Sequence, residues 1–204
     1  GRRPDPLAFP PREYIGTGRY DDPEGKYRVL YLAESATTCY VELLADQRPS
    51  LTALAALRLL PSGEPGDVEP KLGRIPKAWL VDWCQGRALG RAELGPNQRW
   101  LDTYAAETRR ELRGALADTL LELGLDDFDF GDALSRNRKL SQAVSHWAYE
   151  RGFQGIVFSS RFEYGLRCWA VFETAEFQPL DAMPLNPEAD ELNAALNFHG
   201  LTLI

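Results

Sequence analysis

Residues 28–46 read RVLYLAESATTCYVELLAD and contain the transition that decides the fold. The first six, 28–33, are β-branched and aromatic enough to predict a central strand. Ser35 then resembles a helix N-cap, and the pattern after it predicts a helix to about Asp46. Glu42 is expected roughly opposite the apolar face of that helix. This face carries Ala36, Tyr40, Leu43 and Leu44.

Two further apolar runs, Gly155–Phe158 and Cys168–Phe172, predict short strands separated by the polar loop 159–167. Additional strands are predicted over 78–83, 88–94 and 176–180, and helices over 103–123, 139–151 and 187–198. Residues 51–60 fit either a helix or a strand, and residues 61–76 hold four Pro and three Gly, which indicates a loop. Strands and helices alternate without a regular βαβ pattern, which favours an α+β fold.

The chain has 204 residues, which is enough for one domain with a sizeable core. Residues 1–25 are rich in Pro, Gly and charge and are predicted to form an irregular arm. No internal repeat or low-complexity linker interrupts the rest, so we predict a single domain over 1–204. The net charge of −7 argues against a nucleic-acid groove, which needs a basic stripe.

Cys39, Cys84 and Cys168 are odd in number and far apart, which favours buried free thiols in a reducing cytosol. No apolar run approaches the roughly 20 residues that a membrane helix needs. The first residues show no secretory pattern. We therefore expect a cytoplasmic protein with no membrane partner.

Several common kinds of site are missing from the sequence. It has no Gly-x-Ser-x-Gly elbow and no P-loop, and the run 16–18 is too short for a dinucleotide fingerprint. His146 and His199 are the only histidines, and no Cys or His pair has metal-ligand spacing. We therefore expect no metal, and we predict a structural role for His146 in its helix.

Arg19, Glu42 and Ser160 stand where the local pattern predicts apolar structure or a plain turn. Taken singly, each has an ordinary explanation, as a turn arginine, a solvated helix residue or a turn cap. Together, an arginine, a glutamate and a serine could bind an anionic ligand and stabilise a positively charged sugar. That is the chemistry of NAD cleavage. Tyr31 either belongs to the core or flanks such a ligand.

The surroundings of these residues resemble the RES family, which is named for its Arg, Glu and Ser. The first segments that carry the resemblance are GRYDDP (18–23), LYLAES (30–35) and VE (41–42). Farther along the chain follow RKLSQ (138–142), GIVFSS (155–160) and CWAVF (168–172). The resemblance therefore covers about 18–45 and 137–173, and residues 46–136 are not diagnostic.

The resemblance implies an ADP-ribosyltransferase-like fold of mixed β-sheets flanked by helices. It also implies a toxin of a bacterial toxin–antitoxin system that consumes NAD as its substrate. By position, the arginine, tyrosine, glutamate and serine of the family fall on Arg19, Tyr31, Glu42 and Ser160. The family also tends to carry an earlier arginine, for which Arg2, Arg3 and Arg12 are candidates. Its usual Asn after the Arg-aromatic pair is Asp21 here.

In the expected mechanism, Glu42 holds the ribose hydroxyls and stabilises an oxocarbenium-like ribose. Arg19 anchors the pyrophosphate or the nicotinamide ribose, and Tyr31 packs on the nicotinamide side. Ser160 hydrogen-bonds the ligand and holds Glu42, while Arg161 is a weaker candidate for a phosphate contact. The acceptor of ADP-ribose stays open between water, inorganic phosphate and a protein side chain.

Two alternatives remain beside NAD consumption. One is a mono-ADP-ribosyltransferase that modifies a specific protein, and the other is an inactive toxin-like domain that binds a partner. The toxin interpretation implies a cognate antitoxin with a helix-turn-helix domain, while the oligomeric state stays open.

Overall fold

The structure is a computed structural model that describes residues 5–58 and 72–204. Contacts divide the chain into two compact units, which are described separately. The Arg19 unit comprises residues 7–34 and 90–181. The Glu42 unit comprises 35–89 and 182–204, together with the described residues before Leu7. The single domain over 1–204 stays a prediction.

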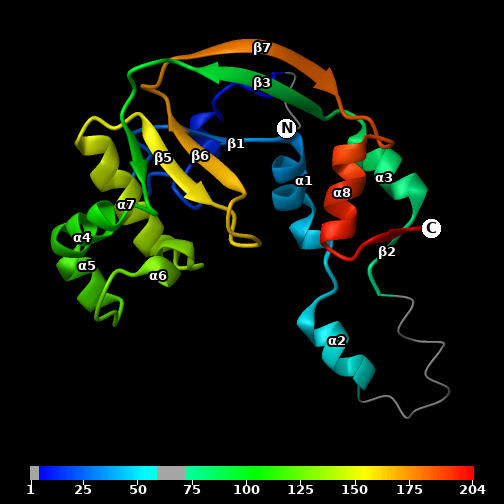
Figure 1. The fold of residues 1–204 in the computed structure, drawn as a ribbon, viewed down its shortest axis with the longest axis horizontal. Coiled ribbons are helices and arrows are strands. Elements are labelled where there is room, and N and C mark those ends of the chain that lie inside the picture. Colours follow the sequence, from blue (N-terminus) through cyan, green and yellow to red (C-terminus); the bar gives the residue numbers. More distant parts are fainter. Residues whose placement is uncertain (1–4, 59–71) are drawn as a thin grey trace. The chain divides into compact units, whose positions relative to one another are not determined.

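A four-stranded mixed sheet forms the centre of the Arg19 unit (Figure 1). Its strands, in spatial order, are β1 (Val29–Ala33), β6 (Arg167–Phe172), β5 (Gly155–Ser159) and β4 (Trp100–Asp102). β6 pairs antiparallel with both β1 and β5, whereas β4 pairs parallel with β5. The strands predicted over 28–33, 155–158 and 168–172 are confirmed. β4 was not predicted, because three residues are too few for a periodic pattern.

The register of this sheet places the central residues of three strands on one face. Tyr31 lies opposite Ala170, and Ala170 lies opposite Ile156. Because directly opposed side chains point to the same face and side chains alternate along a strand, Phe158 shares this face. The core forms between this face and the helices, and it includes Ala170, Ile156 and Phe158.

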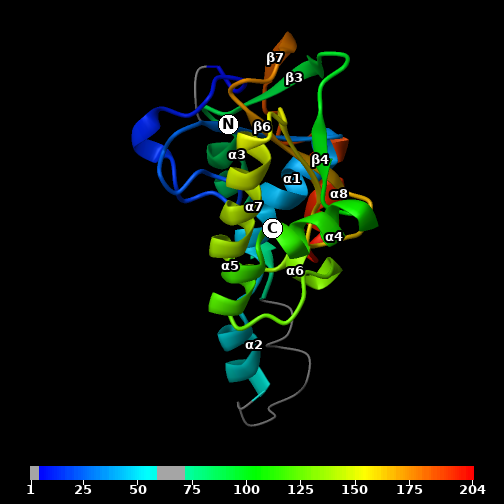
Figure 2. The same ribbon diagram turned by 90° about the vertical axis from the view of Figure 1, so that its left-hand side faces the viewer.

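The helices of the Arg19 unit gather beside the sheet (Figure 1). They are α4 (Ala106–Ala115), α5 (Ala117–Glu122), α6 (Phe130–Leu134) and α7 (Arg138–Glu150), and the short η1 (Arg12–Tyr14) precedes β1 in the chain. α5 contacts α7 (Figure 2), and Leu112, Leu120 and Val144 from α4, α5 and α7 belong to the same core. α7 confirms the helix predicted over 139–151.

The single helix predicted over 103–123 is wrong. The chain forms two helices there, α4 and α5, which meet at Leu116, where φ is −111° and ψ is 20°. Gly114 lies two residues before the break and weakens the helix there. The predicted end at Gly124 is confirmed, because this glycine adopts a left-handed φ of 70° after α5.

The Glu42 unit consists mainly of helices. They are α1 (Ala36–Leu44), η2 (Ala45–Gln47), α2 (Leu51–Arg58), α3 (Lys77–Cys84) and α8 (Asp190–Phe198). β2 (Arg74–Ile75) and β8 (Thr202–Leu203) pair in parallel. Figure 1 shows α1 beside α8, and the two helices pack against each other. The predicted helix over 187–198 is confirmed as α8.

α1 confirms the predicted cap but corrects the predicted apolar face. The side chain of Ser35 accepts a hydrogen bond from the backbone nitrogen of Thr38 at 3.1 Å. Tyr40 and Leu44 are buried as predicted, whereas Leu43 is exposed. Thr38 and Val41 are buried as well, because α1 packs with the Thr38 side of the helix inward. Glu42 is exposed, as predicted.

The strand predicted over 78–83 is wrong, because these residues belong to helix α3. Its buried residues, Leu80 and Cys84, are four apart, which is helical spacing that a short apolar run cannot reveal. The ambiguous segment 51–60 is helical over its described part, 51–58. Of the predicted loop 61–76, residues 61–71 lie outside the described residues, and β2 occupies 74–75.

β3 (Ala88–Leu94) and β7 (Phe177–Pro184) form a two-stranded sheet. β3 confirms the predicted bounds, and β7 extends four residues beyond the predicted strand over 176–180. Both strands cross the boundary between the units, after Leu89 and after Asp181. The sheets and helices together confirm the predicted α+β class.

The three cysteines lie within the described residues, and no disulfide joins them. Cys84 and Cys168 are buried, and Cys39 is half-buried. Among the described residues, no helix combines the length and the apolar character that crossing a membrane requires.

Candidate functional site

The turn that carries Arg19 is organised by the carboxylate of Asp21, which is only 7% exposed. Its Oδ2 accepts hydrogen bonds from the backbone nitrogens of Gly16 at 3.1 Å and Gly18 at 2.7 Å. Its Oδ1 accepts from the hydroxyl of Tyr31 at 3.1 Å. Both carboxylate oxygens of Asp21 therefore accept hydrogen bonds that stabilise the turn, which is the usual role of an acidic residue at such a position.

Gly18 is required for this arrangement. A Cβ atom at position 18 would lie 2.3 Å from Oδ1 of Asp21 and 2.6 Å from the hydroxyl oxygen of Tyr31. Both atoms are already held by hydrogen bonds, so neither can give way cheaply. The Gly-Arg pair in the sequence thus reflects a close approach of the backbone to Asp21.

Helix α7 fixes the same turn from the other side. The hydroxyl of Ser141 donates to the carbonyl of Arg19 at 2.6 Å, and that of Ser145 donates to the carbonyl of Tyr20 at 2.6 Å. The amide of Gln142 donates to the carbonyl of Gly16 at 3.1 Å. These buried polar side chains satisfy turn carbonyls that would otherwise be buried without partners.

The guanidinium of Arg19 lies against two aromatic rings. Its Cζ is 5.3 Å from the ring centre of Tyr20 and 5.5 Å from that of Phe158. One terminal nitrogen donates to the backbone carbonyl of Ala133, in α6. Nε is buried and has no hydrogen-bond partner among the described residues.

Arg19 forms no ion pair with any carboxylate in the described part of the chain. This is notable in a chain with 30 acidic and 23 basic residues. Its guanidinium instead contacts two aromatic rings and a backbone carbonyl, so no carboxylate among the described residues neutralises its charge. An arginine in this state is suited to bind an anionic ligand.

Two tyrosines, Tyr20 in the turn and Tyr31 in β1, have raised pKa values. Burial raises the pKa of Tyr20 to about 12, and the positive charge of Arg19 acts in the opposite direction. Burial, followed by the charge of Asp21, raises the pKa of Tyr31 well above its usual range. Tyr31 is nevertheless 41% exposed, while its hydroxyl is held in the turn. Its hydroxyl also accepts from the backbone nitrogen of Tyr20 at 2.8 Å.

Ser160 follows the end of β5 and is 1% exposed. Its backbone nitrogen donates to the carbonyl of Leu166 at 2.7 Å, which continues the register of β5 and β6 by one pair. Because side chains alternate, Ser160 shares a sheet face with Phe158 and therefore with Tyr31. Its hydroxyl oxygen accepts from the backbone nitrogen of Phe162 at 3.1 Å, which shapes the loop that follows.

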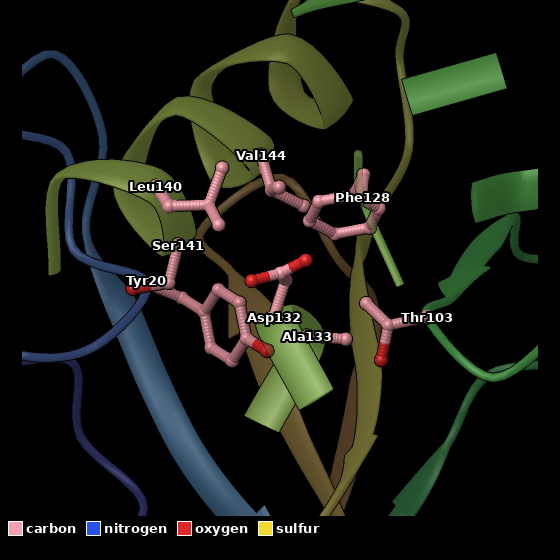
Figure 3. Close-up of a pocket in the computed structure, with 8 residues that line it drawn as sticks. All are labelled: Tyr20, Thr103, Phe128, Asp132, Ala133, Leu140, Ser141 and Val144. Carbon is pink, nitrogen blue, oxygen red and sulfur yellow. The ribbon is translucent and has the colours of Figure 1, made fainter. Parts of the chain in front are cut away.

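A small cavity lies next to the Arg19 turn (Figure 3). In this view the carboxylate of Asp132 lies between the rings of Tyr20 and Phe128. The cavity measures about 10 Å³, which is at most the space of one water molecule and excludes a nucleotide. It is lined by Tyr20, Thr103, Phe128, Asp132, Ala133, Leu140, Ser141 and Val144.

The acidic residue next in sequence, Asp22, is fully buried and is also engaged structurally. It accepts from the backbone nitrogen of Lys26 at 2.5 Å, and its Oδ1 lies 3.2 Å from Nδ1 of His146. Nε2 of His146 lies 3.1 Å from Glu150. These contacts support the structural role predicted for His146. Within residues 5–58 and 72–204, acidic, His and Cys side chains form no group of three that could hold a metal ion.

The remaining predicted residues lie as follows. Glu42 is exposed on α1, in the Glu42 unit, and Arg161 is exposed in the loop after Ser160, with its Cζ 4.7 Å from the ring centre of Phe162. Arg12 donates to the carbonyl of Gly25 at 2.8 Å and pairs with Glu173 at 3.3 Å. Arg2 and Arg3 lie outside the described residues.

The sequence grouped Arg19, Tyr31, Glu42 and Ser160, of which the structure holds all but Glu42 in one unit. Sequence reasoning missed the residues that position them. From the sequence, Asp21 is noted only because it stands where the RES family usually has Asn, although the nearby Gly-Arg pair indicates a tight turn. Ser141 and Gln142 were noted only as part of RKLSQ. Ser141 and Gln142 lie beside Leu140 and Val144, which are buried apolar residues of α7. Polar residues next to the apolar positions of a helix were therefore the available signal.

Both the sequence and the structure are similar to those of known proteins. A family model described as RES domain matches residues 2–190. A chain of the M. tuberculosis MbcT-MbcA toxin-antitoxin complex is similar in structure, with a TM-score of 0.50 and 18% sequence identity. The similarity covers 93% of this chain and 79% of that one. Among curated proteins, none matches this sequence.

Proposed function

The chain belongs to the RES-domain family, and from that premise we propose that it is a toxin-like enzyme that cleaves the nicotinamide–ribose bond of NAD. The observation that carries the proposal is the state of Arg19. It is a half-buried cation with no acidic partner among the described residues, supported by the rings of Tyr20 and Phe158. A guanidinium in such a setting suits the pyrophosphate of a dinucleotide.

In the proposed reaction, the bond between C1′ of the ribose and the nicotinamide nitrogen breaks. The bonding electrons leave with the ring, which departs as neutral nicotinamide, and positive charge develops on the ribose. Water then bonds to C1′ and releases one proton, which gives ADP-ribose. With inorganic phosphate as acceptor, a phosphate oxygen bonds to C1′ instead and gives ADP-ribose that carries the phosphate on this carbon.

The transition state of this reaction is therefore dominated by a cationic ribose. Enzymes gain most from groups that are matched to such developing charge. We assign this role to the carboxylate of Glu42, which would also hold the ribose hydroxyls. The exposed position of Glu42 on α1 leaves its carboxylate accessible to a ligand.

The other residues have supporting roles in this proposal. Ser160 shapes the loop after β5 through its contact with Phe162 and would hydrogen-bond the ligand. The ring of the partly exposed Tyr31 would pack on the nicotinamide side while its hydroxyl holds the turn. Arg161, exposed in the same loop as Ser160, would contact a phosphate.

A toxin of this kind implies an antitoxin, and we propose that one with a helix-turn-helix domain binds this chain. The similarity to a chain of a toxin-antitoxin complex supports this part of the proposal at the level of the fold. Co-expression with a candidate antitoxin should protect cellular NAD, and copurification would test the contact itself. An antitoxin that copurifies but leaves NAD loss unchanged would contradict inhibition.

Product identification tests the reaction itself. The purified protein is incubated with labelled NAD, with and without phosphate, and the products are separated by mass. We expect free nicotinamide together with ADP-ribose or its phosphate. Label transferred to a protein would instead favour mono-ADP-ribosylation. Intact NAD after long incubation, without growth arrest on expression, would favour an inactive partner-binding domain.

A further inference from the structure

We propose that the rings of Tyr104, Phe130 and Tyr164 form a base-stacking subsite for the adenine of the dinucleotide. The centres of the Tyr104 and Phe130 rings are 5.0 Å apart, at an interplanar angle of 51°. Tyr164 lies 5.9 Å from Tyr104 and 6.0 Å from Phe130. Each of the three rings in this cluster therefore neighbours the other two. This inference rests on the proposed function, since it assigns a place to one half of that substrate.

The cluster is open to solvent. Tyr164 is 79% exposed and Phe130 is 37% exposed, whereas Tyr104 is half-buried. Single exposed apolar residues are ordinary, but large aromatic rings gathered at one exposed place commonly indicate a binding surface. A planar base can stack on such rings without any hydrogen bond, because every base has a π-face.

Three separate elements of the Arg19 unit bring these rings together. Tyr104 lies in the turn between β4 and α4, Phe130 is the first residue of α6, and Tyr164 lies in the loop between β5 and β6. These residues are far apart in the sequence. The fold, and not the local sequence, therefore brings the three rings together.

The same elements are attached to Arg19. Ala133, which follows Phe130 on α6, accepts a hydrogen bond from the Arg19 guanidinium. Burial raises the pKa of Tyr104, and the positive charge of Arg19 acts in the opposite direction. The loop of Tyr164 begins at Ser160 and is closed by the hydrogen bond from Ser160 to Leu166.

The chemistry of the ligand selects adenine as the occupant. In NAD, one ribose joins the pyrophosphate to adenine, so a base next to a phosphate-binding arginine is expected. Nicotinamide is the leaving group, and the proposed function already assigns its side of the ligand to the ring of Tyr31, on β1. The cluster lies wholly within the Arg19 unit, and neutral adenine has the larger stacking surface.

Tyr164→Ala tests the inference with the least risk to the fold, because this ring is mostly exposed. Affinities for AMP and for nicotinamide mononucleotide are measured by calorimetry on the whole chain. We expect AMP affinity to fall by about 5- to 150-fold, with that for nicotinamide mononucleotide unchanged. Tyr164→Phe keeps the ring and should keep AMP affinity. Tyr14→Ala, at another exposed tyrosine of this unit, is the matched control.

In turnover assays, Tyr164→Ala and Phe130→Ala should raise KM for NAD and leave kcat unchanged. Unchanged AMP affinity in Tyr164→Ala, or no AMP binding to the wild-type protein, would overturn the inference. An equal fall in the affinity for nicotinamide mononucleotide would also overturn the inference, because it would show that the rings bind nicotinamide. If the wild-type protein binds AMP through Tyr164 but leaves NAD intact, the subsite stands and the proposed function fails.

Discussion

Tyr31 donates a hydrogen bond from its hydroxyl to Oδ1 of Asp21 at 3.1 Å, and this bond ties strand β1 to the turn that carries Arg19. The other oxygen of Asp21 holds the backbone nitrogens of Gly16 and Gly18. One carboxylate thus connects the strand and the turn. The position of the guanidinium depends on a residue that does not itself touch the proposed ligand.

Asp21→Ala should release Arg19 from its position. It removes the acceptors of two backbone donors and of the Tyr31 hydroxyl, so we expect the free energy of unfolding to fall by about 1–3 kcal/mol. NAD turnover should fall with it. Urea denaturation and an NAD assay measure the two effects.

Asp21→Asn separates the shape of this residue from its charge. The amide oxygen can still accept from the two backbone nitrogens, and Asn is the usual residue here in the resemblance to the RES family. Stability and turnover should therefore stay closer to the wild type than in Asp21→Ala. Asp126→Ala, at an exposed aspartate, controls for the loss of an acidic charge. Equal loss in the Asn and Ala variants would contradict the assigned role.

Gly18→Ala should disturb the same turn by crowding it. The new Cβ would force Asp21 and Tyr31 apart, and we expect a loss of about 1–3 kcal/mol in the free energy of unfolding. Gly114→Ala is the matched control, because a Cβ there meets no atom within 4 Å and replaces a glycine inside helix α4. This control should be neutral or stabilising by up to about 1 kcal/mol. If Gly18→Ala were equally harmless, the tight turn would not be required.

Arg19→Lys keeps the charge but loses the planar fork that lies against Tyr20 and Phe158. We expect KM for NAD to rise by about tenfold or more, because an ammonium group cannot reproduce these contacts. Arg110→Lys, at an exposed arginine of α4, should leave KM unchanged. A lysine variant that binds NAD as tightly as the wild type would remove Arg19 from the site.

Tyr20 makes the stability of the chain depend on pH in the alkaline range. Its pKa is raised to about 12 in the folded chain, against an ordinary value of 10.0. Above pH about 10 the unfolded chain loses this proton while the folded chain keeps it, so stability falls as pH rises. The contribution is at most about 1.4 kcal/mol per pH unit. Tyr20→Phe should flatten the slope in urea denaturation, and an unchanged slope would show that Tyr20 ionises freely.

The elements of the site were easier to predict than its internal contacts. Tyr31 belongs to an apolar strand and Ser160 follows the end of another, so their places relative to the sheet follow from local pattern. The role of Asp21 depends on a tyrosine ten residues later, and that of Ser141 on a carbonyl 122 residues earlier. Local periodicity carries no information on such pairs.

The errors in secondary structure have a similar physical origin. Residues 77–84 combine apolar side chains at a spacing that fits a strand or a helix when the run is short. β4 has three residues and exists because Leu101 pairs with Ile156 of β5. Both features are decided by tertiary packing, which a single sequence does not display.

The loss of NAD with time, followed for the wild-type protein and for Glu42→Gln, tests the central claim most directly. The exchange is nearly isosteric and removes the carboxylate that is proposed to stabilise the cationic ribose, so we expect turnover to fall about 100-fold or more. Glu111→Gln, at an exposed glutamate of α4, should consume NAD at the wild-type rate. Circular dichroism checks that all three proteins are folded. Full NAD turnover by Glu42→Gln would contradict the mechanism.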